Sequence, residues 1–225
     1  MAYWNKRWID GNTGFHEKLP HKDITRNRGE LLWKPSTRIF FPLCGKSVDM
    51  FVLAEEGHEI VGIECSEVAV LEFFAENNLE FTREPWSSDR NFDVFTSNRL
   101  KLKLVRGDLF AASTQLLGKF DSVWDRGSLI AVDPSQRLQY ASMIRSVVQS
   151  DTRYFIQGVE YDETKVENAP PPFSLPEKAV RALFGEDFHV EVRENVKCEE
   201  SAKTYNVDEF FNIKYTLTTK NKPTL

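Results

Sequence analysis

Two residues, Gly45 and Glu64, have the types and the spacing expected for binding a nucleoside. Gly45 follows an apolar run at 39–41, and Glu64 ends a second apolar run at 60–63. Strand, tight turn, helix, strand and acid is the order of a nucleotide-binding βαβ unit. In such units the acid lies about 20 residues after the turn and accepts hydrogen bonds from the ribose hydroxyls. The pair therefore predicts a site for a ribose-containing ligand.

The turn at Gly45 narrows the kind of ligand. It contains a single glycine, whereas a dinucleotide fingerprint contains three. The turn thus lacks a run of backbone amides suited to a pyrophosphate, which disfavours a nicotinamide oxidoreductase. A nucleoside without phosphate fits better, and S-adenosylmethionine (AdoMet) is one, with its ribose, adenine and methionine tail. The alternative is an ordinary crossover between parallel strands that binds no ligand.

The carboxyl ends of the predicted strands supply the other candidate residues, because ligands of doubly wound sheets bind there. Glu64 would hold the ribose. Asp108 would accept a hydrogen bond from the adenine amino group, with Leu109 against the ring. Leu43 and Gly45 would border the methionine part. Alternatively, Asp108 caps the helix that follows it.

Arg126 follows the strand predicted at 120–124, where a substrate should meet the cofactor. A guanidinium there can bind a carboxylate of the cofactor or of the substrate, or stabilise a thiolate. The alternatives are an ion pair of Arg126 with Asp125 or Asp121, and Asp125 is also a candidate helix cap. Cys44 lies near a predicted helix start, but no histidine accompanies it in the sequence, so we expect a structural thiol.

Alternating elements must position these residues. Apolar patterns predict strands at 38–43, 59–64, 101–106, 120–124, 154–159, 188–193 and 213–219, with helices at 46–56 and 67–77. The segment 79–100 interrupts the alternation and either lengthens the third strand or forms a small hairpin. The pattern predicts an α/β fold with a Rossmann-like, doubly wound, mostly parallel sheet of seven strands. No linker divides the chain, so we expect a single domain over 1–225, with its core at 38–225.

Two further helix starts have clear capping signals. Asp133 precedes a proline, which suits an N-cap followed by the first helical position. The run from Ser174 to Glu177 has the form of a capping box, in which the serine hydroxyl and the glutamate side chain satisfy the first backbone amides. These signals predict helices after Asp133 and after Ser174.

The N-terminal segment 1–37 is rich in aromatic residues. Trp4 and Trp8 are spaced i, i+4, so a short helix would place both on one face, and Phe15 follows them. The segment is either an arm anchored on the core or a lid that excludes water from the site and packs on a cation or a planar substrate.

Composition sets the broad class of protein. The 225 residues are 41% hydrophobic and 28% charged, with a net charge of −5. We expect a small-molecule substrate and no nucleic-acid partner, since nucleic acids require a basic face. No apolar run approaches the ~20 residues that cross a bilayer, and there is no signal peptide, so we expect a cytoplasmic protein without a membrane partner. The three cysteines and four histidines are scattered and suit neither a disulfide framework nor a metal site.

Six motifs together resemble those of the thiopurine S-methyltransferase family. They cover almost the whole chain in order: W-x3-W-x2-G-x-T-x-F-H at 4–16, FFPLCGK at 40–46, GHEIVGIE at 57–64, GKFDSVWDRGSL at 118–129, PPPFSLP at 170–176 and RALFG at 181–185. The resemblance implies a class I AdoMet-dependent methyltransferase that methylates the sulfur of aromatic or heterocyclic thiols such as thiopurines and releases S-adenosylhomocysteine. We expect it to act as a monomer.

The resemblance also assigns roles to residues. It implies that Phe15 touches the substrate as well as the cofactor. From its place at a strand end, we expect Arg126 to be catalytic and to bind the substrate. With the strand-end residues above, the expected cofactor-binding residues are Trp4, Trp8, Phe15, Leu43, Gly45, Glu64, Asp108, Leu109 and Arg126.

Two positions depart from the family pattern and leave the natural substrate open. Asp108 stands where the family often has serine, and Ser201 stands in a stretch that has an arginine in mammalian members. One alternative on the same fold is a methyltransferase for halide, sulfide or small aliphatic thiols. A remoter alternative is a non-catalytic nucleoside-binding protein.

Overall fold

The computed structural model describes residues 2–26, 28–167 and 169–220. Over these residues, nine strands hydrogen-bond in the order β3-β4-β5-β2-β1-β6-β7-β9-β8, and the sheet is mixed. The predicted α/β class is confirmed, whereas the prediction of seven mostly parallel strands is wrong. All seven predicted strands are present, and the segment 79–100 adds two more. The chain divides into two compact units, Met1–Val123 and Trp124–Leu225, and the single domain stays a prediction.

Parallel strands form the centre of the first unit. β1 (Arg38–Phe41) pairs with β2 (Glu59–Glu64), β2 pairs with β5 (Leu102–Arg106), and the start of β6 (Phe120–Arg126) pairs with β1. The helix α4 (Val48–Glu55) connects β1 to β2, and α5 (Glu67–Glu76) follows β2. Ile39, Phe40 and Ile60 are fully buried. Because β1, β2 and β5 are parallel, their carboxyl ends lie at one edge of the sheet.

The segment 79–100 forms the hairpin alternative. β3 (Phe81–Pro85) and β4 (Asp93–Ser97) are antiparallel, and β4 is antiparallel to β5. Phe81 packs between Phe74 of α5 and Phe95 of β4, with ring centroids 4.6 and 5.4 Å apart. The hairpin therefore buries aromatic surface against α5, which explains why a polar segment still adds strands to the sheet.

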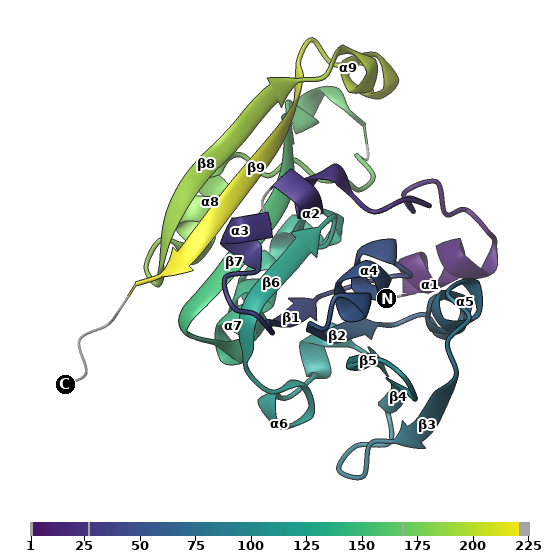
Figure 1. Cartoon of the computed structure of the whole chain (residues 1–225). Coiled ribbons are helices and arrows are strands. Elements are labelled where there is room, and N and C mark those ends of the chain that lie inside the picture. The colour runs from purple at the N-terminus through teal and green to yellow at the C-terminus, as the bar shows by residue number, and fades with distance from the viewer. Residues whose placement is uncertain (1, 27, 168, 221–225) are drawn as a thin grey trace. The chain divides into compact units, whose positions relative to one another are not determined.

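Three short helices occupy the N-terminal segment: α1 (Ala2–Ile9), α2 (Lys22–Arg26) and α3 (Arg28–Leu31). The short helix predicted from the spacing of Trp4 and Trp8 is confirmed as α1, which lies beside α5 (Figure 1). The backbone amide of His21 donates to Oδ1 of Asp49 in α4, at 2.7 Å. The segment is thus anchored to the helices that flank β2.

The first unit ends with two short elements after β5. The 3-10 helix η1 (Leu109–Ala111) begins after Asp108, and α6 (Thr114–Leu117) begins after Ser113. The Ser113 hydroxyl accepts a hydrogen bond from the Leu116 amide at 3.2 Å, as an N-cap does.

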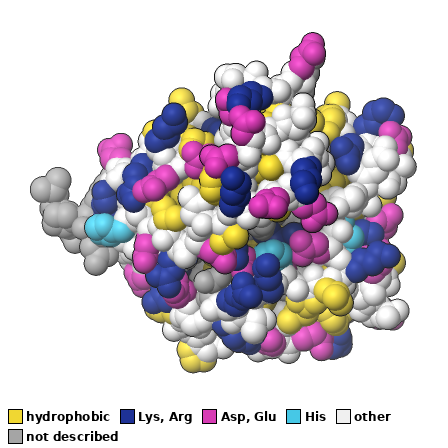
Figure 2. Space-filling model, turned by 90° about the horizontal axis from the view of Figure 1, so that it is seen from above, with side chains coloured by type: hydrophobic (Ala, Val, Ile, Leu, Met, Phe, Trp, Pro, Cys, Tyr) yellow, Lys and Arg dark blue, Asp and Glu magenta, His cyan; other side chains and the backbone are white. Residues whose placement is uncertain are grey.

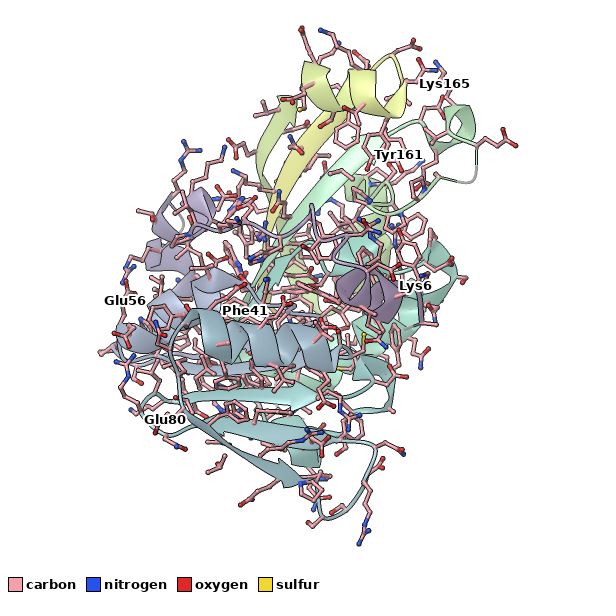
Figure 3. The ribbon with its side chains drawn as sticks, turned by 90° about the vertical axis from the view of Figure 1, so that its right-hand side faces the viewer. Lys6, Phe41, Glu56, Glu80, Tyr161 and Lys165 are labelled. Carbon is pink, nitrogen blue, oxygen red and sulfur yellow. The ribbon has the colours of Figure 1, made fainter. Side chains whose placement is uncertain are left out.

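The second unit begins within β6 and contains three long strands. β7 (Val148–Tyr161) and β8 (Phe188–Lys197) each pair antiparallel with β9 (Phe210–Thr219). All three are longer than the sequence predicts. Tyr161 lies at the end of β7, with Lys165 beyond it in the 3-10 helix η4 (Glu163–Lys165; Figure 3). Besides η4, the helices of the second unit are η2 (Leu129–Ala131), η3 (Pro134–Gln136), α7 (Arg137–Val147), α8 (Glu177–Phe184) and α9 (Glu199–Tyr205).

One of the two predicted helix caps in this unit is present. The Asp133 carboxylate accepts from the Ser135 amide at 2.9 Å, and Pro134 starts η3 as predicted. The predicted capping box at Ser174 is wrong, because α8 begins at Glu177 with no side-chain cap. The Ser174 hydroxyl instead accepts a hydrogen bond from the Tyr161 amide at 3.1 Å. Ser174 therefore ends the β7 ladder and does not start a helix.

Candidate active site

Gly45 and Glu64 lie in direct contact, although their pairing was predicted from spacing alone. The Gly45 amide donates to Glu64 Oε2 at 2.9 Å, and the Ser66 amide donates to Oε1 at 2.8 Å. The Cys65 thiol donates to the same Oε1 at 3.2 Å. The parallel pairing of β1 and β2 brings the turn and the acid to one edge of the sheet. Sequence reasoning missed the donors Cys65 and Ser66; their only signal is a position between the acid and the next helix.

The Glu64 carboxylate is 4% exposed, and its environment is unusual for an acid. Burial raises the pKa of the Glu64 carboxyl above its ordinary value, while the amides of Ser66 and Gly45 and the Cys65 thiol act in the opposite direction. A buried carboxylate that is surrounded by donors is an acceptor of fixed orientation.

The aromatic segment packs on the turn that contains Gly45. Trp8 is 5% exposed, and its indole lies against Gly45. Phe15 meets both Trp4 and Trp8 edge-on, with centroids 5.3 Å apart in each pair, and remains 40% exposed. The structure therefore brings four predicted site residues together with Glu64, and it leaves the Phe15 ring partly open to solvent.

The turn contains two residues in the left-handed region of backbone conformation. Leu43 and Gly45 both have positive φ angles, 44° and 51°. The left-handed region costs a non-glycine residue roughly 1–2 kcal/mol. Such strain at Leu43 is typical of functional turns.

Asp108 and Leu109 follow β5 beside the same edge, since the Gly107 amide donates to the Glu64 carbonyl oxygen at 2.9 Å. The Asp108 carboxylate accepts from the Phe110 amide at 3.0 Å and so caps η1, the alternative considered for this residue. Leu109 is buried. Phe92 of the β3–β4 hairpin packs so tightly on Gly107 that a Cβ there would lie 2.1 Å from its ring, a contact that the sequence did not predict.

Arg126 is the last residue of β6 and belongs to the second unit, where it is half-buried. Its neighbour Asp125 is fully buried and accepts hydrogen bonds from the amides of Ser128 and Leu129, at 3.1 and 2.9 Å. The capping alternative for Asp125 is therefore observed. Asp121, the other candidate partner of Arg126, accepts from the Lys34 ammonium at 2.6 Å in the first unit.

Cys44 and Cys65 have the properties of structural thiols, as expected for Cys44. Burial raises the pKa of the Cys44 thiol well above its ordinary value, and burial beside Glu64 raises that of Cys65 to about 12. Such thiols are poor nucleophiles at neutral pH. Ser201 lies in α9, where its hydroxyl accepts from the Cys198 thiol at 3.1 Å. Within the described ranges, no cluster of His, Cys, Asp and Glu is arranged to hold a metal ion.

Two surface properties bear on possible partners. Basic and acidic side chains are interspersed over the face seen in Figure 2, so this face lacks the continuous basic surface that phosphate backbones require. Among the residues that the structure describes, no helix is long and apolar enough to span a bilayer.

Comparison with solved structures defines the class of fold. The 1,6-didemethyltoxoflavin-N1-methyltransferase of Burkholderia thailandensis, solved with S-adenosylhomocysteine bound, superposes with a TM-score of 0.62 at 14% identity, covering 98% of this chain and 87% of that one. A SAM-dependent methyltransferase of Methanosarcina mazei superposes with a TM-score of 0.61 at 14% identity, covering 89% and 98%. The fold is that of the AdoMet-dependent methyltransferases.

Sequence relatives define the family. The thiopurine S-methyltransferase family model matches residues 1–220. Thiopurine S-methyltransferase of Rattus norvegicus is 37% identical over 219 residues, covering 96% of this chain and 90% of the relative. A probable thiopurine S-methyltransferase of Danio rerio is 35% identical over 224 residues, covering 99% and 96%. The chain belongs to the thiopurine S-methyltransferase family and is an AdoMet-dependent S-methyltransferase.

Proposed function

We propose that this enzyme methylates the sulfur of an aromatic or heterocyclic thiol. Thiopurines, after which its relatives are named, belong to this class. The observation that carries the proposal is the buried Glu64 carboxylate, held by the Gly45 amide beneath the aromatic segment. A planar thiol suits a site bordered by the rings of Trp4, Trp8 and Phe15, because aromatic rings stack on planar ligands.

The residues around Glu64 fit the nucleoside part of AdoMet. A carboxylate offers about four acceptor positions, and Glu64 binds the Gly45 and Ser66 amides and the Cys65 thiol. The thiol is the weakest of these donors, so it is the contact that a ribose hydroxyl would replace. We further propose that Asp108 and Leu109 border the adenine and that Leu43 and Gly45 border the methionine part.

AdoMet, when bound, supplies an electrophilic methyl group on a cationic sulfur. We propose that the chain contributes three effects around that group. Glu64 orients the nucleoside, the Trp4–Phe15 segment acts as a lid that excludes water, and Arg126 favours the thiolate form of the substrate electrostatically. Aromatic thiols are already acidic, so no strong general base is required. We also propose that the enzyme acts as a cytoplasmic monomer.

A methyl-transfer assay with labelled AdoMet tests the substrate class. Thiophenol and a thiopurine represent aromatic thiols, and 2-mercaptoethanol, sulfide and iodide represent the alternatives. We expect the largest kcat/KM for the aromatic thiols. A larger kcat/KM for sulfide, iodide or 2-mercaptoethanol would contradict the proposal and identify that acceptor's class as the substrate. Failure to retain AdoMet or S-adenosylhomocysteine, with no transfer to any acceptor, would identify a non-catalytic protein.

A further inference from the structure

The backbone that carries Arg126 is closed into a ring by the preceding side chain. Asp125 Oδ1 accepts hydrogen bonds from the amides of Ser128 and Leu129, at 3.1 and 2.9 Å. The enclosed residues are Arg126 and Gly127, and Gly127 has a φ of 85°, a conformation that favours glycine. The orientation of the Asp125 carboxylate therefore determines the direction in which the chain leaves β6 at Arg126.

Two tyrosines fix that orientation from separate elements. Asp125 Oδ2 accepts from the hydroxyls of Tyr140 in α7 and Tyr154 in β7, at 2.6 and 2.7 Å. All three side chains are almost completely buried. With two donors on each oxygen, the carboxylate has no rotational freedom left, because any rotation would break several short hydrogen bonds.

Stability alone is a weak explanation for this arrangement. A buried carboxylate costs solvation energy, and apolar residues of similar volume commonly replace buried charged groups without loss of stability. The pKa of Asp125 is raised by burial, and the pKa values of both tyrosines are raised well above the ordinary value of 10 by burial and by the nearby charge. Both hydroxyls therefore remain donors at neutral pH. What the arrangement does secure is a single conformation for the turn after β6.

We propose that Asp125, Tyr140 and Tyr154 are positioning residues that hold Arg126 in the orientation required for methyl transfer. The inference rests on the proposed role of Arg126. The two tyrosines act through the Asp125 carboxylate and the turn that it closes, and they do not contact the substrate. Loss of one hydroxyl loosens the turn and misdirects the guanidinium, and small misplacements of a catalytic group cost about ten- to a hundredfold in rate.

A double-mutant cycle separates positioning from a general effect on folding. The variants are Tyr140→Phe, Tyr154→Phe, Arg126→Ala and each tyrosine variant combined with Arg126→Ala. The readouts are kcat/KM for an aromatic thiol at saturating AdoMet, and the melting temperature. Each tyrosine variant should lose at least about tenfold in kcat/KM when Arg126 is present and less than about twofold when it is absent. Its loss in melting temperature should be the same in both backgrounds.

Tyr215→Phe is the matched control. Tyr215 is fully buried in the same unit, and its hydroxyl donates to the Leu175 carbonyl oxygen at 3.0 Å, without contact to Asp125. The substitution removes the same atom from a buried hydrogen bond. We expect a similar loss of melting temperature with less than about a twofold change in kcat/KM.

The outcomes are distinguishable. If Tyr140→Phe and Tyr154→Phe lower kcat/KM by the same factor with and without Arg126, or leave it unchanged, the positioning inference is overturned while the role of Arg126 stands. If Arg126→Ala alone keeps the wild-type rate, the proposed function of Arg126 fails. Asp125→Asn, which keeps the shape but replaces one acceptor with a donor, should reproduce the larger loss of the two tyrosine variants.

Discussion

The Trp8 indole occupies the space in which a side chain at Gly45 would begin, since a Cβ there would lie 2.9 Å from Trp8 Cζ2. The next residue, Lys46, has its ammonium 5.9 Å from the Trp8 ring centroid and forms ion pairs with Glu72 and Glu76 of α5, at 2.8 and 2.6 Å. The turn at Gly45 thus packs against the N-terminal aromatic segment on one side, and its Gly45 amide binds the Glu64 carboxylate.

Gly45→Ala should lower both stability and cofactor affinity. The positive φ of 51° costs alanine roughly 1–2 kcal/mol, and displacement of the Trp8 indole adds about 1–3 kcal/mol. Gly57→Ala is the matched control, because Gly57 has a φ of 93° but no atom within 4 Å of its Cβ position. Chemical denaturation should place the free energy of unfolding of Gly45→Ala below that of Gly57→Ala. Equal free energies of unfolding would show that the Trp8 indole can move aside without loss of stability.

Glu64→Gln should weaken AdoMet binding by about ten- to a hundredfold, since a hydrogen bond to a charged group contributes about 1.5–3 kcal/mol. Glutamine keeps the shape but turns one acceptor into a donor, which opposes the amide of either Gly45 or Ser66. Titration calorimetry measures the dissociation constant. Glu59→Gln, at the other end of β2 and half-exposed, should leave it unchanged. An unaltered affinity in Glu64→Gln would refute the ribose assignment.

AdoMet affinity should fall as the pH is lowered. The ionised carboxylate is the acceptor, and burial raises the pKa of Glu64 above its ordinary value of 4.5, so protonation begins at a higher pH than for an exposed glutamate. The contribution of Glu64 to the free energy of unfolding changes in the opposite direction. It rises as the pH falls through the raised pKa, because protonation relieves the cost of burying the charge. Calorimetry between about pH 8 and about pH 5 checks the affinity. In Glu64→Gln the AdoMet affinity should no longer depend on pH in this way. If it still fell at low pH, another group would be responsible.

Arg126→Lys should lower kcat while the protein remains folded, because lysine keeps the charge but loses the planar fork of donors. Arg126→Ala should cost about a hundredfold in kcat, the scale for loss of one electrostatic contact to a developing charge. Steady-state kinetics with an aromatic thiol measures both. Arg181→Lys, on the exposed face of α8 beside Glu177, is the control and should keep wild-type kinetics. Wild-type turnover in both Arg126 variants would remove its catalytic role.

Phe15→Ala should raise the KM for an aromatic thiol and have only a small effect on the melting temperature. The ring is 40% exposed, and its edge-on contacts with Trp4 and Trp8 contribute about 1 kcal/mol each. Leu19→Ala, in the same segment and 76% exposed, removes an apolar side chain without these contacts and should change neither KM nor melting temperature. An unchanged KM in Phe15→Ala would leave the aromatic segment as an anchor only.

The local signals in the sequence proved sufficient for the parallel strands of the first unit. Buried parallel strands are continuous apolar runs, so β1 and β2 were predicted to within two residues. The same signals leave two alternatives for the segment that forms β3 and β4, because these polar strands become stable only when Phe81 packs on Phe74 and Phe95. The capping box at Ser174 failed for a related reason, since the backbone of β7 competes for the same hydroxyl.

The sequence by itself determined the βαβ unit, the acid at the end of its second strand, and the family, because these depend on residue type and on short separations along the chain. Only the tertiary structure decided what each polar group contacts. It gave Glu64 the Gly45 amide as a partner, turned Asp108 into a cap, and gave Asp125 two tyrosines from distant elements. Hydrogen bonds form between neighbours in space, and a chain that folds into a sheet makes most of its neighbours from residues far apart in sequence.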